Sequence, residues 1–271
     1  MTLCTQHPPF SRLSAQMDAL LIDLEIPVMG YAIALVKDGH IAFEGAGGFR
    51  RYWEEQPQRC LPMETDSRCR IASVSKLFTC VAVMQQAELG RLVLDGDAGD
   101  YLGFSLRNPH FPQQTITPRM LMAHISSLRD GGMYALPKRI PLSACFRPGT
   151  SWWEDGSHFA APDGVHNMGP GGYYYYSNLN YGVLGTIVER LSGERFDRYM
   201  CAHVLKPMGL EASFNPGDFS PEQLYRLASI YKRTSGGVWA VDQPWTAQAD
   251  YFQDVSLSPD RIRISNPDLG L

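Results

Sequence analysis

The sequence predicts an α+β fold in which a pair of strands comes first and a mainly helical stretch follows. Lys37-Asp38-Gly39 separates two apolar runs, and Asp-Gly in that setting is a strong hairpin signal. Further along the chain, apolar residues recur at intervals of three and four, which indicates helices. Because a two-stranded hairpin alone is marginal in water, we expect additional strands, and residues 237–241 and the C-terminal tail are the places for them.

Each expected element rests on a local pattern. The helices carry apolar stripes; Gly90, Gly193 and Pro207 stop three of them and Pro118 begins another, as these residue types commonly do. In chain order, helices are expected at residues 11–25, 74–89, 117–126, 179–192, 194–206 and 221–232, strands at 31–36, 40–45 and 237–241, and a charged loop at 49–68. Residues 147–172 are rich in Gly, Pro, Trp and His without any period, which predicts a long loop or insertion.

Composition limits the class of protein. The 271 residues suit one large domain or two small ones, and we expect a single domain over residues 1–271. The net charge of −4 argues against nucleic acid as a partner, because no excess of cations is present to neutralise phosphates. No apolar run reaches the roughly 18 residues of a membrane span. The N-terminus lacks a secretory pattern, so we expect a cytoplasmic protein whose six scattered cysteines are free thiols.

Two Ser-x-x-Lys sequences are present, at Ser73–Lys76 and at Ser229–Lys232. Ser73 is expected at a helix start, where free N–H groups and the helix dipole favour an oxyanion, and Lys76 would lie one turn away on the same face. Ser229 is expected late in a helix, where the N–H groups are already used. On spacing alone, an ordinary helix cap at Ser73 and a solvated charge at Lys76 are the simpler interpretation.

A second candidate group is Tyr176-Ser177-Asn178. A tyrosine can transfer protons when a cation stabilises its anion, and an asparagine amide can orient a neighbour or hold a substrate carbonyl. The simpler alternative is a tyrosine-rich core edge with Asn178 as a helix cap. His124 allows a Ser–His interpretation, but the chain contains no Gly-x-Ser-x-Gly sequence, so we expect His124 to be structural.

The segment Arg70–Thr79 resembles the active-site block of the serine β-lactamase and penicillin-binding-protein superfamily, and is closest to its class C-like branch, which includes esterases and D-aminopeptidases. The resemblance covers roughly residues 15–240. It implies a β-lactamase/transpeptidase-like fold, with an antiparallel sheet packed against a helical region and the active site between them. Further matching blocks follow in the family's order at residues 89–95, 116–128, 146–149, 176–185 and 207–210.

The resemblance implies a serine hydrolase that forms an acyl-enzyme on an ester, D-peptide or β-lactam carbonyl. Ser73 is the implied nucleophile, with its backbone N–H as one oxyanion donor. Lys76 and Tyr176 are implied to share the proton transfer, and Asn178 to orient Lys76 or the substrate amide. No metal or organic cofactor is implied. The expected partners are small-molecule ester, amide or β-lactam substrates, with no nucleic acid and no membrane span.

The chain departs from the family pattern in two places. Ser127 stands where the family usually has a glycine, which predicts backbone strain in the turn after His124. The family's third motif, a Lys/His-Thr-Gly strand, is not found, because Arg233-Thr234-Ser235-Gly236 is a poor match in the wrong place. The closing strands would lie beyond residue 271, so we expect an incomplete domain. The alternative function is a non-catalytic or truncated remnant that acts as a binding or interaction module.

Overall fold

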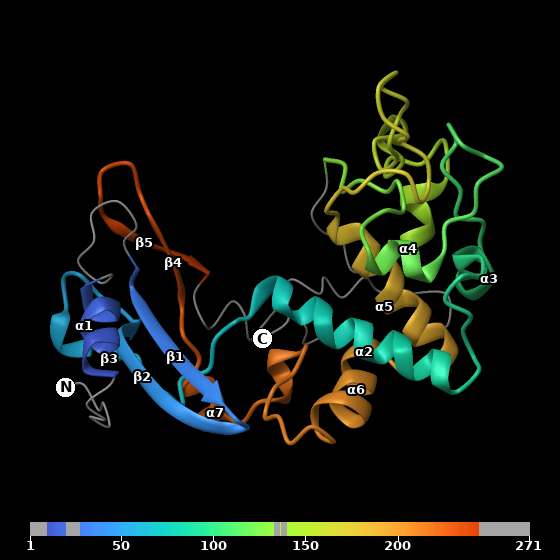
Figure 1. Ribbon diagram of the computed structural model, residues 1–271. Coiled ribbons are helices and arrows are strands. Elements are labelled where there is room, and N and C mark those ends of the chain that lie inside the picture. The colour runs from blue at the N-terminus through green and yellow to red at the C-terminus, as the bar shows by residue number, and fades with distance from the viewer. Residues whose placement is uncertain (1–9, 20–27, 133–135, 137–139, 244–271) are drawn as a thin grey trace. The chain divides into compact units, whose positions relative to one another are not determined.

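The expected hairpin is present in the computed structural model, which describes residues 10–19, 28–132, 136 and 140–243. Strand β1 (Gly30–Lys37) pairs antiparallel with β2 (His40–Arg51), and β2 pairs with the short β3 (Leu61–Pro62) (Figure 1). Asp38 and Gly39 form the turn with φ of 51° and 76°, the left-handed values that Asp-Gly turns require. Strand β2 runs through Arg51, so the beginning of the segment expected to be a loop is strand.

The described chain divides into two units. The first contains residues up to Arg70 together with residues from Pro216 onward, and the second contains residues 71–215. In the first unit, α1 (Ser11–Ala19) lies on the hairpin: the Tyr31 hydroxyl donates to Asp18 at 2.6 Å. The first expected helix is therefore confirmed as far as residue 19, and its remaining residues lie outside the described part of the chain.

The C-terminal part of the first unit corrects one expectation. The predicted helix 221–232 stops after α7 (Pro221–Tyr225), and β4 (Ile230–Arg233) follows and pairs antiparallel with β5 (Trp239–Gln243). Ser229 is thus not in a helix; its backbone N–H donates to the Arg50 carbonyl. Ile and Tyr at the start of β4 favour a strand. The hydrogen bonds that this segment makes with the Arg50 carbonyl and with β5 stabilise the extended chain rather than a helix.

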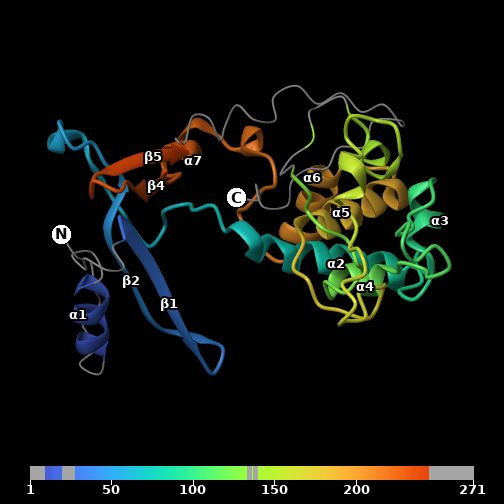
Figure 2. The same cartoon turned by 90° about the horizontal axis from the view of Figure 1, so that it is seen from above.

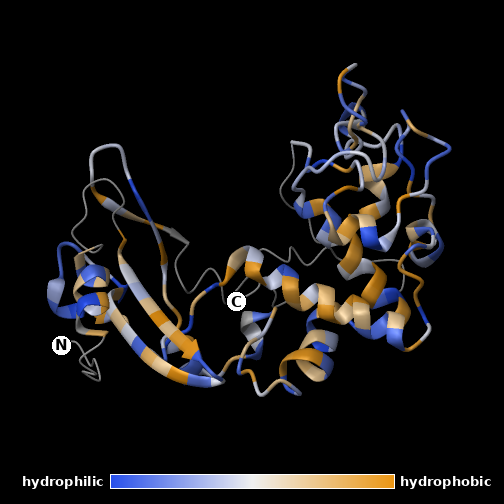
Figure 3. Ribbon diagram, in the orientation of Figure 1, coloured by the Kyte–Doolittle hydropathy of each residue, from blue (hydrophilic) through white to orange (hydrophobic). Residues whose placement is uncertain are grey.

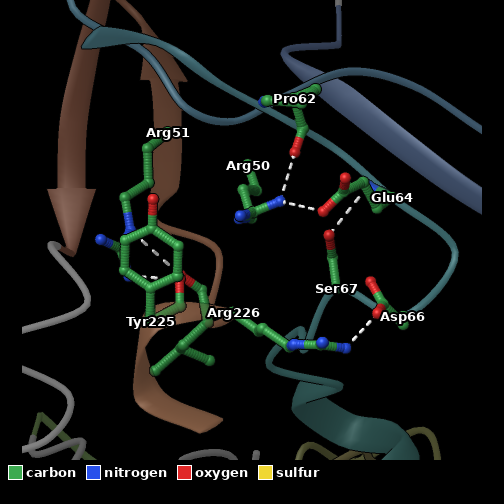
Figure 4. A network of polar contacts seen from close by, with 9 residues as sticks. Arg50, Arg51, Pro62, Glu64, Asp66, Ser67, Tyr225 and Arg226 are labelled. Atoms are coloured by element: carbon green, nitrogen blue, oxygen red, sulfur yellow. Dashed lines mark hydrogen bonds and ion pairs between the residues drawn. The ribbon is translucent and has the colours of Figure 1, made fainter. Parts of the chain in front are cut away.

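Two adjacent arginines at the end of β2 both lie over the ring of Tyr225 from the C-terminal segment of the first unit, and Arg51 also bonds to that segment (Figure 4). Arg50 donates to the Pro62 carbonyl at 2.8 Å and to Glu64 at 2.6 Å. Arg51 donates to the Tyr225 carbonyl at 2.8 Å, and its guanidinium lies 5.2 Å from the centre of the Tyr225 ring. Both arginine side chains are buried, so their charges are compensated by these acceptors rather than by water.

The second unit is helical. The long helices α2 (Ser75–Glu88) and α5 (Asn178–Ser192) pack on each other, as Figures 1 and 2 both show. Shorter helices surround them: α3 (Ala98–Leu102), α4 (Pro118–Met122), and α6 (Phe196–Tyr199), which continues as a π-helix over Met200–Leu205. The α5 helix is apolar along much of its length (Figure 3), and its residues from Asn180 to Glu189 are all buried.

The segment 147–172 is loop, as expected, apart from a short 3-10 turn at Glu154–Gly156. It is not only a surface feature, however. His158 and Phe159 are buried, and Phe159 forms a β-bridge with Leu128. The loop is therefore part of the core of the second unit.

Helix α4 ends at Met122, four residues earlier than expected, because the chain turns into left-handed conformations. His124 has φ of 57° and Ser127 has φ of 68°. Ser127 is also buried, and its hydroxyl accepts from Asn108 Nδ2 at 3.1 Å. The expectation of a glycine-preferring backbone at Ser127 is therefore confirmed.

Replacement of Ser127 by glycine is expected to leave a more stable protein than replacement by alanine, by about 1 kcal/mol. Both variants lose the same hydroxyl, so the difference isolates the backbone strain. At the exposed Met84, in the middle of α2, the order should reverse, because glycine costs about 1 kcal/mol relative to alanine in a helix. Chemical denaturation of the four variants measures both differences; equal stability of the two Ser127 variants would contradict the strain.

Candidate active site

Four side chains of the second unit form a continuous hydrogen-bonded chain. Ser73 Oγ lies 2.6 Å from the Tyr176 hydroxyl. Lys76 Nζ donates to Ser73 Oγ at 3.1 Å and to Asn178 Oδ1 at 2.8 Å. The structure thus brings together all four residues that the two sequence motifs singled out, although they lie about a hundred residues apart in the chain.

Ser73 is presented by a short turn that leads into α2. Residues Ala72–Val74 form a 3-10 turn, and the α-helix begins at Ser75. Ala72 adopts φ of 45°, a conformation that costs a non-glycine residue free energy, so the chain bends sharply just before Ser73. Ser73 is exposed, as a nucleophile that must meet a substrate has to be.

Lys76 occupies a different environment one turn further along. Its side chain is buried, with 5% of its surface exposed, and lies between two aromatic rings. Nζ is 5.0 Å from the centre of the Tyr176 ring and 5.5 Å from that of Tyr181. The faces of these rings and the oxygens of Ser73 and Asn178 all present negative charge to Nζ. Lys76 is therefore not the solvated surface charge of the simpler interpretation.

His124 has the structural surroundings that were expected of it. It is buried, and Nδ1 accepts from the Ser177 backbone N–H and from Asn180 Nδ2, each at 3.2 Å. The centre of its ring lies 4.6 Å from that of the Tyr176 ring, so the imidazole packs against the tyrosine. Burial, and then the positive charge of Lys76, lower the pKa of His124 from its usual value.

This pKa shift has a consequence for stability. A histidine whose folded pKa is lowered binds fewer protons in the folded than in the unfolded state. Its contribution is therefore complete above the unfolded pKa near 6.5 and is lost as the pH falls below it. His124→Asn keeps an acceptor and tolerates the left-handed backbone, but does not titrate. We expect the wild type to lose more stability than this variant between pH 7 and pH 5 in urea denaturation; parallel losses would contradict the buried neutral histidine.

Asp130 is a residue of the site that the sequence analysis did not single out. Its carboxylate accepts from Ser177 Oγ at 2.7 Å, from the Leu179 backbone N–H at 2.9 Å and from Asn178 Nδ2 at 3.1 Å. Asn178 is the cap of this helix that the sequence suggests, which hid the need for an acceptor elsewhere in the chain. The structure shows that Ser177 makes no side-chain cap at the start of α5.

The other sequence candidates are not assembled in this way. Ser229 precedes β4 and Lys232 lies within it, and an extended chain points residues three apart to opposite sides. Arg233 is the last residue of β4 and Thr234–Gly236 lie in the turn to β5, where Thr234 accepts from the Val238 backbone N–H. Within residues 10–19, 28–132, 136 and 140–243, no group of three or more His, Cys, Asp or Glu residues could hold a metal ion. No helix in that part of the chain is long and apolar enough to cross a membrane.

Antiparallel strands, a helical unit and a Ser-x-x-Lys sequence at the start of α2 are the features of a β-lactamase/transpeptidase-like fold. Residues 17–268 match the family model described as Beta-lactamase, and the chain belongs to that family. Protein flp of Staphylococcus aureus (strain MW2) is 24% identical over 184 residues, which are 68% of this chain and 34% of flp. The D-alanyl-D-alanine-carboxypeptidase/endopeptidase AmpH of Escherichia coli (strain K12) is 27% identical over 224 residues, which are 76% of this chain and 55% of AmpH.

Solved structures show the same fold. The octameric penicillin-binding protein homologue from Pyrococcus abyssi aligns with a TM-score of 0.67 and 24% identity, over 86% of this chain and 50% of its own. Simvastatin synthase (LovD) from Aspergillus terreus aligns with a TM-score of 0.66 and 20% identity, over 97% of this chain and 67% of its own. The chain thus spans between about a third and about half of the length of the two curated relatives.

Proposed function

We propose that this protein is a serine hydrolase that cleaves an ester or amide carbonyl through an acyl-enzyme on Ser73. The observation that carries the proposal is the hydrogen-bonded chain from Tyr176 through Ser73 and Lys76 to Asn178. An ordinary helix cap at Ser73 would require neither a buried lysine nor a tyrosine hydroxyl within 2.6 Å of its oxygen. Serine hydroxyls are weak nucleophiles, and a group that takes their proton has to be within hydrogen-bond reach.

The reaction follows from these positions. Ser73 Oγ attacks the carbonyl carbon, and its proton passes to the Tyr176–Lys76 pair, both members of which lie within hydrogen-bond distance of Oγ. The Ser73 backbone N–H, at the start of the helical turn, donates to the carbonyl oxygen as it becomes an oxyanion. The carbonyl bond to the leaving oxygen or nitrogen breaks, and the leaving group takes the proton. Water then hydrolyses the ester to Ser73, with the same pair accepting its proton.

The substrate is proposed as a small ester, D-peptide or β-lactam. AmpH is by its name a D-alanyl-D-alanine carboxypeptidase/endopeptidase, which supports a peptide ending in D-alanine as one member of this group. The 42% exposure of Tyr176 and the exposed Ser73 leave the reacting atoms open to a molecule of this size. A p-nitrophenyl ester, a D-alanyl-D-alanine peptide and a chromogenic cephalosporin would separate the three by their relative kcat/KM.

Covalent labelling tests the proposal. A fluorophosphonate and a fluorescent penicillin should each add one equivalent of mass, and the modified peptide should contain Ser73 and not Ser229. A folded protein that neither reagent modifies would favour the alternative, a binding or interaction module that retains the fold without the chemistry. Label on a peptide other than the one that contains Ser73 would contradict the assignment of the nucleophile.

A further inference from the structure

The carboxylate of Asp130 divides its two oxygens between two tasks. Oδ1 accepts from the Leu179 backbone N–H and from Ser177 Oγ, whereas Oδ2 accepts from Asn178 Nδ2. Leu179 lies in the first turn of α5, where the N–H groups have no partner within the helix. Oδ1 therefore caps this 15-residue helix from another part of the chain, with its charge at the positive end of the helix dipole.

The second oxygen determines which way round the Asn178 amide sits. An amide has a donor end and an acceptor end, but an ionised carboxylate only accepts. Asn178 Nδ2 must therefore face Asp130, which leaves Asn178 Oδ1 to accept from Lys76 Nζ at 2.8 Å. With the amide reversed, the donors of Asn178 and Lys76 would oppose each other, and Lys76 would lose one of the acceptors that fix it beside Ser73.

We propose that Asp130 is a positioning residue for acyl transfer, which acts by fixing the orientation of the Asn178 amide toward Lys76. The inference rests on the proposed function of Ser73, because its effect is expressed in the rate at which that serine reacts. It adds a fifth side chain to the site, one that acts through Asn178 and makes no hydrogen bond to Ser73 among those described. Asp130 is connected to Ser73 Oγ by three successive hydrogen bonds, which pass through Asn178 and Lys76.

Asp130→Asn separates the two tasks of the carboxylate. The new amide can keep its oxygen on Ser177 and Leu179, so the cap of α5 is retained, but its nitrogen then faces Asn178 and forces that amide to reverse. We expect the rate of fluorophosphonate labelling of Ser73 to fall by about 10- to 100-fold, the range for hydrogen bonds that involve charged groups. The matched control is Asp97→Asn, because Asp97 also caps a helix, by accepting from Gly99 N in α3, but does not contact Asn178. The control is expected to label at the wild-type rate once folded.

The reciprocal exchange provides the decisive measurement. In Asp130→Asn/Asn178→Asp, the asparagine at 130 donates to the carboxylate at 178, which again presents an acceptor to Lys76. The net charge of the pair is unchanged. We expect this double variant to label at least about tenfold faster than Asp130→Asn and faster than Asn178→Asp, which places two carboxylates against each other. If Asp130 only stabilised the fold, the exchange would not be expected to restore the labelling rate.

The outcomes distinguish the inference from the proposed function. Failure of the wild type to label at Ser73 would refute the proposed function. If the wild type labels, an unchanged rate in Asp130→Asn, or a double variant no faster than its single variants, would overturn the role of Asp130. Circular dichroism and thermal unfolding identify the folded variants. Should Asp130→Asn not fold, Asn178→Asp with the cap intact serves as the single variant, and a double variant no faster than it overturns the inference.

Discussion

Ser73→Ala is expected to abolish covalent labelling and to lower kcat by several orders of magnitude, on the order of 10⁴- to 10⁶-fold. The variant removes the oxygen that forms the acyl bond and that lies within hydrogen-bond distance of both Tyr176 and Lys76. The fold should be unaffected, because Ser73 is exposed and alanine suits a helical turn. Intact-mass spectrometry after incubation with fluorophosphonate measures the labelling, and hydrolysis of a p-nitrophenyl ester measures the rate.

Ser75→Ala is the matched control for this variant. Ser75 lies two residues further on, is buried, and its Oγ has no hydrogen-bond partner among the described residues. Its removal should change labelling by less than about twofold, since nothing in the hydrogen-bonded chain depends on it. Persistent labelling of Ser73→Ala, or hydrolysis near the wild-type rate, would show that the nucleophile lies elsewhere.

Lys76→Met is expected to have the second largest effect, a loss of about 10²- to 10⁴-fold in the rate of acylation. Methionine fills a similar volume between the rings of Tyr176 and Tyr181 but offers no donor to Ser73 Oγ. Because a buried amine is replaced by an apolar side chain, the stability of the fold should be kept or increased. Stopped-flow labelling measures the rate, and thermal unfolding confirms the fold.

His124→Asn serves as the comparison for the proton transfer. His124 lies behind Tyr176, and its Nδ1 is occupied by Ser177 and Asn180, so its removal should affect stability more than chemistry. A histidine base would leave a limb near pH 6–7 in the pH–rate profile, and this limb should be absent. If folded His124→Asn lost acylation as completely as Lys76→Met, the assignment of the proton-transfer pair would be wrong.

Predictions from the sequence succeeded where the signal is local. Lys37-Asp38-Gly39 predicted the hairpin because the turn itself requires left-handed residues. The two helices that present the site were predicted from their stripes and from the glycines after them, and the structure has them at Ser75–Glu88 and Asn178–Ser192. The proximity of the two motifs was implied by the resemblance to a family and by no spacing in the chain.

The errors arose where distant groups decide the local structure. Residues 226–232 were expected to be helical, but the Tyr231 hydroxyl accepts from the Tyr52 backbone N–H, 179 residues earlier in the chain. The cap of α5 comes from Asp130, 49 residues before the N–H that it accepts. A pattern confined to neighbouring residues contains no information about such partners, and Asn178 was the local cap that it suggested.

The first unit is discontinuous in sequence, and this has a consequence for the order of folding. Among the residues that the structure describes, the second unit comes from the range 71–215 alone, and this range carries all four candidate catalytic side chains. The contacts of Arg51 with Tyr225 span 174 residues, so the first unit has to close a much longer loop. During synthesis the hairpin leaves the ribosome well before its partners at α7 and β4 exist, whereas the helical unit can assemble from segments that emerge together. We therefore expect the four candidate catalytic side chains to come together on the nascent chain first. The arginines of β2 gain their partners only later, when α7 and β4 have been synthesised.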